Sequence, residues 1–195
     1  MLKRMRTFLL SSILLITCGL AAQTVNVPPL KNKMAVYEGV MKVDSTITKE
    51  VLFDRARAFI NSWFSSSIPI IQYASKDSGQ LIINPAISLQ FTRLGRLFNG
   101  GLWHFVGTFD FKDGKYRYKL ERFSNTGFMG GTSNACDLGP IECLYDDGNC
   151  WPGVNLGNRP LQMECKTILT DVHKEIVKLM AAFDAEMRKP LKDDW

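Results

Sequence analysis

One pair of residues, Asp113-Gly114, constrains this fold most, because it joins two runs in which apolar and polar residues alternate. In that setting an Asp-Gly pair predicts a tight β-hairpin, since a type I′ turn needs positive φ at both central residues. The predicted hairpin extends from Leu102 to Phe123. Facing residues would then match in character: Lys112 with Lys115, Phe111 with Tyr116, Asp110 with Arg117, and Phe109 with Tyr118. This matching indicates a well-specified register, because a slip of one residue would turn every apolar side chain to the wrong face.

The start of the chain indicates export. Three basic residues, Lys3, Arg4 and Arg6, precede an apolar run at 8–17 that is too short to span a bilayer comfortably. Small residues then offer a cleavage point before Gln23. We therefore predict a signal peptide at 1–22, a mature protein in the periplasm or at the cell surface, and no transmembrane segment after cleavage.

A lipid anchor at Cys18 is the less favoured alternative. Thr17 precedes it, whereas lipoprotein signals usually carry Gly, Ala or Ser at that position. Removing the leader also lowers the formal net charge from +5 to +2, because the leader holds three basic residues and no acidic one. Bulk attraction to nucleic acid is therefore not expected, and we predict no nucleic-acid partner.

Four cysteines remain after the leader: Cys136, Cys143, Cys150 and Cys165. An even number in an exported protein predicts two disulfides, for which four cysteines allow three pairings. The spacing contains no Cys-x-x-Cys, so neither a redox pair nor a zinc ribbon is indicated. We expect Cys165, near the start of the last helix, to tie the cysteine-rich segment to that helix.

The rest of the chain, in order, predicts one domain. A tether at 23–33 precedes a strand at 34–43 and a helix from Thr48, its expected N-cap, to Phe64. Further strands are expected at 68–74 and 80–91, with a break at Pro85, followed by a connection at 92–101 and the hairpin. Glycine-rich residues 124–160 show no regular period, and an amphipathic helix spans about 162–188.

This order is strand, helix, four strands, disulfide-stapled loop, helix. An antiparallel sheet of about five strands with both helices on one face buries two apolar helix stripes and one apolar sheet face. We therefore predict an α+β two-layer sandwich at 34–195, with the cysteine-rich loop at 124–160 as an insertion. At 195 residues the chain is long enough for one such domain.

Three stretches together resemble a known family: the helical run 48–60, the turn Asp77-Ser78-Gly79, and the hairpin turn 112–118. The chain is similar over 34–123 to exported bacterial domains of unknown function of the DUF4468 type, which have a TATA-binding-protein-like (TBP-like) fold. The resemblance implies export and this fold, and it brings no catalytic residues. The cysteine-rich segment departs from the family pattern.

Candidate chemistry is sparse. Neither His104 nor His173 neighbours a cysteine or serine in a catalytic motif, and disulfides would leave no free thiol for a Cys–His pair. Asp146-Asp147-Gly148-Asn149 lacks the alternate spacing and distal Glu of a calcium loop. We therefore predict no catalytic residue, no metal site and no cofactor.

Two features are candidates for binding. Lys112, Lys115, Arg117 and Lys119 would share the solvent face of the hairpin with Asp110 and Glu121. Such a face can meet an anionic glycan or lipid headgroup, although outward lysines commonly serve only solubility. Trp151, beside Cys150, is the other candidate, since loops on rigid scaffolds often carry binding groups.

The sequence thus favours a non-catalytic module of the cell envelope that binds a protein, glycan or lipid. The alternative is a small exported enzyme with its site in the cysteine-rich loop. The absence of any nucleophile–base or metal-ligand constellation in the sequence favours the binding module.

Overall fold

A computed structural model of the chain describes residues 26–64, 69–93, 96–128, 137–145 and 162–190. Two short strands, β1 (Leu30–Lys31) and β2 (Met34–Ala35), form a small hairpin beside the main sheet. The main sheet contains β3 (Tyr37–Lys42), β4 (Ile71–Ser75), β5 (Gln80–Ile83), β6 (Ala86–Arg93), β7 (Arg96–Lys112), β8 (Lys115–Thr126) and β9 (Gly139–Pro140). The helices are α1 (Lys49–Trp63), a 3-10 turn η1 (Ile141–Leu144) and α2 (Gln162–Met187).

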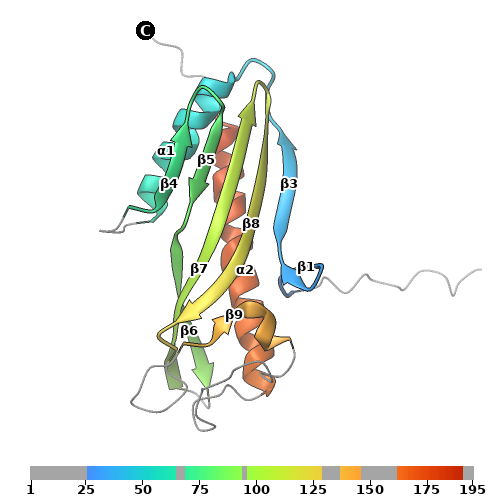
Figure 1. Ribbon diagram of the computed structural model, residues 1–195, viewed down its shortest axis with the longest axis vertical. Helices are drawn as coiled ribbons and strands as arrows, with labels where there is room; N and C mark the ends of the chain where they lie inside the picture. Colours follow the sequence, from blue (N-terminus) through green and yellow to red (C-terminus); the bar gives the residue numbers. More distant parts are fainter. Residues whose placement is uncertain (1–25, 65–68, 94–95, 129–136, 146–161, 191–195) are drawn as a thin grey trace, which may run out of the picture.

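The architecture is the predicted two-layer α+β sandwich. The strands follow the order β3-β8-β7-β5-β4 and pair in antiparallel fashion, and both long helices lie behind the sheet in Figure 1. The expected number of about five strands was wrong, because the sheet has seven. The two extra strands lie toward its lower end, where β6 pairs with β7 and β9 pairs with β8.

The β7–β8 hairpin confirms the predicted register. Lys112 faces Lys115, Phe111 faces Tyr116, Asp110 faces Arg117 and Phe109 faces Tyr118. Gly114 has a φ of +66°, but Asp113 is not among the residues with positive φ, so the predicted type I′ turn was wrong although the register is as predicted. The two arms are the longest strands of the molecule, so this hairpin forms the centre of the sheet.

The segment 92–101, expected to be a connection, is instead part of a second hairpin. Strands β6 and β7 pair from Arg93 facing Arg96 up to Ala86 facing His104. The register shifts between Ser88 and Gln90, where the two glycines of the Asn99-Gly100-Gly101 stretch add an extra residue to β7. A glycine pair inside a strand marks a β-bulge here, although the same pair is equally typical of a loop.

A second bulge keeps the lower half of β8 in register with the core. Arg122 has a φ of 59°, and the β7–β8 register shifts between His104 and Val106. The inserted residue lets both Leu120 and Phe123 face inward, with 0% and 1% of their surfaces exposed, although three positions separate them. Without the bulge, strict alternation would turn Phe123 to the solvent.

Helix α1 begins as predicted. The Thr48 side chain accepts a hydrogen bond from the Val51 amide, and Glu50 lies in the first turn, where a carboxylate is favourable. Leu52, Ala56, Phe59 and Ile60 are buried as their spacing indicated. Trp63 continues the helical spacing of these residues, but it is 38% exposed and stacks on Phe59 at the end of the helix.

The core is a continuous apolar layer between the helices and the sheet. Phe183 of α2 occupies its centre, with its ring centroid 5.4 Å from that of Phe59 on α1 and 4.8 Å from that of Phe109 on β7. One polar contact also crosses this layer, because the Tyr116 hydroxyl donates a 2.7 Å hydrogen bond to Asp184. Burial and this carboxylate raise the pKa of Tyr116, so the hydroxyl keeps its proton.

We expect Tyr116→Phe to lower the free energy of unfolding by about 1.5 kcal/mol, because it removes a hydrogen bond to a charged group. Urea denaturation followed by circular dichroism measures the change. Tyr118→Phe is the matched control, since the Tyr118 hydroxyl forms no hydrogen bond with any described residue. Equal effects of the two substitutions would contradict the assigned role of the Tyr116–Asp184 bond.

The cysteine-rich segment is only partly described. Cys143 in η1 and Cys165 in α2 are buried in the hydrophobic core, and no disulfide joins these two residues. Cys136 and Cys150 lie outside the described residues. No disulfide is therefore found between two described residues, although Cys143 is itself disulfide-bonded. The expected link from Cys165 to the cysteine-rich segment is not shown among the described residues. Residues 137–145, expected to be irregular, contribute β9 and η1 to the domain.

The open face of the sheet as the candidate binding site

No described helix covers the sheet face opposite α1 and α2, and we call it the open face. Alternation along β7 and β8 turns Phe109, Phe111 and Tyr116 toward the helices, where they are buried. It therefore turns their neighbours to the open face. The predicted cationic residues Lys112, Lys115, Arg117 and Lys119 all lie on this face, so the structure brings them together as expected.

A broad hollow of about 680 Å³ lies on the open face, and we call it the central hollow. Strands β3, β7 and β8 supply its lining: Glu38, Gly39, Val40, Thr108, Asp110, Arg117, Tyr118, Lys119 and Glu121. A smaller depression of about 240 Å³ continues toward the hairpin turn, past Lys112 and Lys115. The central hollow and this depression together form a concave surface on the open face, and the predicted cationic residues line it.

The charges in the central hollow are paired. Arg117 donates two hydrogen bonds, of 2.8 and 3.1 Å, to one Asp110 oxygen, and Gln80 donates a 3.0 Å bond to the other. The Lys119 ammonium nitrogen lies 2.6 Å from a carboxylate oxygen of Glu121. These contacts hold the carboxylates between cationic groups, so the hollow presents alternating donors and acceptors.

Glu38 completes the lining as a third carboxylate beside two cations. A hydrogen bond from Lys31, and then the charges of Lys31 and Lys119, hold the pKa of Glu38 below its usual value. The central hollow is therefore not a cationic site, which disfavours the anionic glycan or lipid headgroup that the sequence suggested for this face.

The turn end of the open face differs, because three lysines stand in one row across three strands. Lys42 on β3 faces Lys115 on β8, which in turn faces Lys112 on β7. Among the described residues none of the three has an ion pair. Like charges directly opposite each other destabilise a sheet, so this row is the one uncompensated charge cluster on the open face as described.

The two histidines each contact one hydroxyl. His104 Nε2 on β7 lies 3.0 Å from Thr126 Oγ1 on β8, and His173 Nδ1 on α2 lies 3.0 Å from the Tyr37 hydroxyl on β3. Burial lowers the pKa of His173 and raises that of Tyr37. The second contact joins the first strand of the sheet to the last helix, which gives His173 a structural role.

The lowered pKa of His173 predicts a pH dependence of stability. The unfolded chain takes up this proton first as the pH falls below about 6.5, so the histidine's contribution is present above that pH and lost below it. We expect the melting temperature of the wild-type protein to fall more between pH 7.5 and 5.5 than that of His173→Asn. Differential scanning calorimetry at both pH values measures this, and parallel pH profiles would contradict it.

Several residues of the site were not predicted from the sequence. Glu38, Val40 and Thr108 line the central hollow, but the sequence alone did not reveal that β3 lies beside β8. Trp151, the other predicted binding residue, lies outside the described residues, as does most of the loop in which the alternative enzyme site was placed. Those two hypotheses stay predictions.

Two features of the described residues bear on the chemistry of the protein. No group of three or more His, Cys, Asp or Glu in this part of the chain is arranged to hold a metal ion. No helix in the same residues is long and apolar enough to cross a membrane.

The sheet topology and the two helices on one face define the class as a TBP-like fold. Residues 37–126 match the family model described as a domain of unknown function (DUF4468) with TBP-like fold, so the family resemblance inferred from the sequence is confirmed. The matched segment begins at β3 and ends with β8, and it therefore contains every strand that lines the central hollow.

Solved structures show the same fold. A TBP-like protein from Parabacteroides distasonis aligns with a TM-score of 0.61 at 10% identity, covering 82% of this chain and 96% of the other. A DUF4468 family protein from Bacteroides ovatus aligns with a TM-score of 0.55 at 11% identity, covering 88% and 95%. No curated protein of known function matches this chain.

Proposed function

We propose that this protein is an exported, non-catalytic module of the cell envelope that binds a protein partner on the open face of its sheet. The observation that carries this proposal is the central hollow of about 680 Å³, lined by side chains of both charges on a face that no described helix covers. Concave surfaces with a few converging polar groups are the default candidates for binding sites.

The chemistry of the hollow favours a protein surface over a polyanion. Three carboxylates and two cations line it, and Arg117 and Lys119 are already bound to carboxylates. A polyanion would have to displace these contacts, whereas a mixed-charge protein surface can complement both signs. Val40 and Tyr73, which are 62% and 47% exposed on the same side of the sheet, add the apolar area that protein interfaces use.

Export enters the proposal from the sequence. The leader at 1–22 has the charged start, short apolar run and small-residue end of a signal peptide. An exported domain with a preformed polar hollow would meet its partner in the envelope, and we infer that this is where it acts.

Site-specific photo-crosslinking in the native host tests the proposal. A photoreactive benzoylphenylalanine replaces Thr108, in the central hollow, and in a separate strain replaces Ala58, which is exposed on α1 behind the sheet. We expect a discrete polypeptide adduct from position 108 and none from position 58, because only the first lies in the interface. Mass spectrometry of the adduct identifies the partner.

The result distinguishes the alternatives. An adduct that contains carbohydrate and no polypeptide would replace the protein partner with a glycan. Equal labelling from both positions, or labelling from position 58 alone, would show that the open face is not the binding surface.

A further inference from the structure

Strand β3 is an exposed edge of the main sheet. It pairs with β8 on one side, and no described strand pairs with its other side. An unpaired edge presents backbone donors and acceptors that can pair with another chain, so proteins usually block such edges with charges, bulges or covering loops. In Figure 1, β3 runs along the right-hand margin of the sheet, with β1 beside its lower end only.

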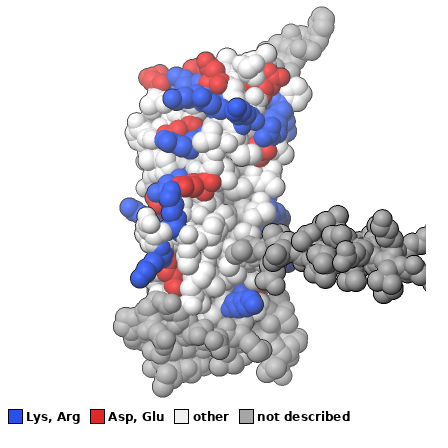
Figure 2. All heavy atoms as spheres, turned by 90° about the vertical axis from the view of Figure 1, so that its right-hand side faces the viewer, with Lys and Arg blue, Asp and Glu red and all other residues white. Residues whose placement is uncertain are grey.

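The surface around this edge is apolar. Val40, at the middle of β3, is 62% exposed, and Val177 on α2 is 48% exposed. On the helix side of β3 lies a groove of about 310 Å³, lined by Tyr37, Met41, Tyr116, Tyr118, Val177, Met180, Ala181 and Asp184, whereas Val40 lies on the open face. Figure 2, which views the molecule from this side, shows a largely uncharged middle, with most charged residues at the top and along the left margin and further Lys or Arg residues below and to the right.

We propose that β3 pairs with β3 of a second copy of this chain, which gives a two-fold dimer with one continuous sheet. The six residues Tyr-Glu-Gly-Val-Met-Lys of β3 fit this partner because they complement themselves. A two-fold axis perpendicular to the sheet keeps both open faces on the same side, so facing residues must lie on the same face. The axis must therefore pass through a residue, and Gly39, Val40 and Met41 are the central choices.

Charge selects Val40 among these three. With the axis at Val40, each Val40 faces its copy, and Glu38 of each chain faces Lys42 of the other. Opposite charges that face each other across strands stabilise the pairing, as does contact between two β-branched side chains. With the axis at Gly39, Glu38 would face Val40, and with the axis at Met41, Lys42 would face Val40; neither choice pairs the charges.

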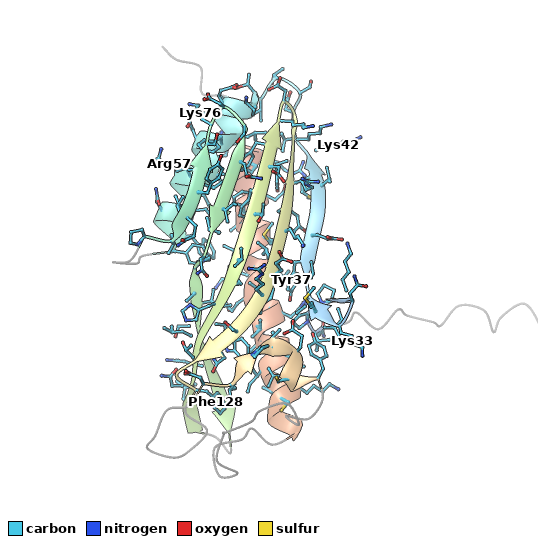
Figure 3. The ribbon with its side chains drawn as sticks, in the orientation of Figure 1. Lys33, Tyr37, Lys42, Arg57, Lys76 and Phe128 are labelled. Carbon is cyan, nitrogen blue, oxygen red and sulfur yellow. The ribbon has the colours of Figure 1, made fainter. Side chains whose placement is uncertain are left out.

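This register also explains the lysine row. Lys42, Lys115 and Lys112 stand side by side without an ion pair among the described residues. In the dimer, Glu38 of the second copy, which also contacts Lys31 of its own chain, extends the row by one strand and brings a negative charge beside Lys42. Figure 3 shows the Lys42 side chain extending outward at the upper end of β3, away from the rest of the sheet. The proposal thus accounts for an arrangement that costs stability in the isolated chain.

Disulfide trapping of the full mature protein tests the register. Facing residues in an antiparallel pair have Cα atoms about 4.5–5.5 Å apart, which is within disulfide range. We expect Val40→Cys to form a covalent dimer in mild oxidant, as seen by non-reducing gel electrophoresis. Glu38→Cys alone should not, because its copies would lie four residues apart, about 13 Å along the strand. A mixture of Glu38→Cys and Lys42→Cys should form the mixed dimer, and the wild-type chain gives the background from native cysteines.

Charge reversal provides the second test and needs no cysteine. Sedimentation velocity of the wild-type protein should show a dimer, which Glu38→Lys and Lys42→Glu each weaken by placing like charges opposite each other. The double variant Glu38→Lys/Lys42→Glu should restore it, because both pairs are present again with the signs exchanged. Circular dichroism confirms that each variant is folded.

Three outcomes would overturn the proposal. The first is a wild-type protein that stays monomeric at all concentrations tested. The second is a dimer that neither charge reversal weakens, which would show that another surface is used. The third is a weakened dimer that the double variant does not restore, together with no Val40→Cys disulfide, which would exclude this register.

Discussion

Replacing Phe183 with alanine is expected to lower the free energy of unfolding by about 3–5 kcal/mol. This side chain is 1% exposed and lies where the two helices meet the sheet. Its ring contacts Phe59 of α1, Phe109 of β7 and Tyr116 of β8, with centroids 4.8–5.4 Å away. The substitution therefore removes the transfer free energy of a buried ring and leaves a cavity bounded by rigid elements that cannot close it.

Urea denaturation of the mature protein, followed by circular dichroism, measures this loss. Val177→Ala on the same helix is the matched control, because Val177 is 48% exposed and its removal leaves no buried cavity in the monomer. We expect the control to change the free energy of unfolding by less than about 0.5 kcal/mol. A similar small effect of Phe183→Ala would contradict the placement of α2 against the sheet.

Gly101→Ala is expected to lower the free energy of unfolding by about 2–5 kcal/mol, the second largest effect. Gly101 lies in the β7 bulge with a φ of +77°, which costs an L-residue about 1–2 kcal/mol. A Cβ atom there would also lie 2.4 Å from the Thr126 carbonyl oxygen and 2.8 Å from Asn125 Nδ2. These neighbours are a backbone oxygen and a buried amide that donates to the Gly100 carbonyl, so overpacking adds about 1–3 kcal/mol.

Gly127→Ala separates the cost of the positive φ from the cost of the steric overlap. Gly127 has a similar φ of +72°, but nothing lies within 4 Å of the position its Cβ would take. In the same urea experiment, Gly127→Ala should therefore lower the free energy of unfolding only by the conformational cost of about 1–2 kcal/mol. Equal losses at Gly101 and Gly127 would show that the close approach of β7 to β8 at the bulge is not as tight as described.

The predictable part of this fold rests on local signals. Asp113-Gly114 located the hairpin turn, and the matched facing pairs predicted its register, although Asp113 lacks the positive φ of a type I′ turn. Thr48 located the start of α1 because the cap hydrogen bond forms within one turn of the chain. The first strand and the last helix were also predicted, since their apolar periods are undisturbed by neighbouring elements.

The features that the sequence analysis missed depend on contacts distant in the chain. Gly100-Gly101 forms a bulge only because β6 and β8 flank it, and in isolation the pair is equally typical of a loop. Leu138 and Ile141 are buried because β9 and η1 pack on the end of β8, although their segment shows no period of its own. Trp63 continues the helical stripe but lies beyond the sheet that would cover it.

The candidate site likewise has features that local sequence signals predict and features that depend on contacts distant in the chain. Alternation along one hairpin predicted that the four cationic residues share a face, and they do. Arg117 and Lys119 pair with Asp110 and Glu121 of the same hairpin, while β3 and β5 add Glu38 and Gln80 to the same face. That pairing changes the expected ligand from an anion to a mixed-charge surface. The open face also borders the edge strand β3, so the proposed dimer would place two central hollows side by side.

The most direct test of the account is the affinity of the partner captured at position 108 for wild-type protein and two tryptophan variants. Thr108→Trp fills the central hollow with a large ring, whereas Ala58→Trp adds the same ring to the far side of the molecule. Calorimetric titration should give a dissociation constant at least about tenfold weaker for Thr108→Trp and unchanged for Ala58→Trp. Equal affinities for all three proteins would show that the open face of the sheet is not where the partner binds.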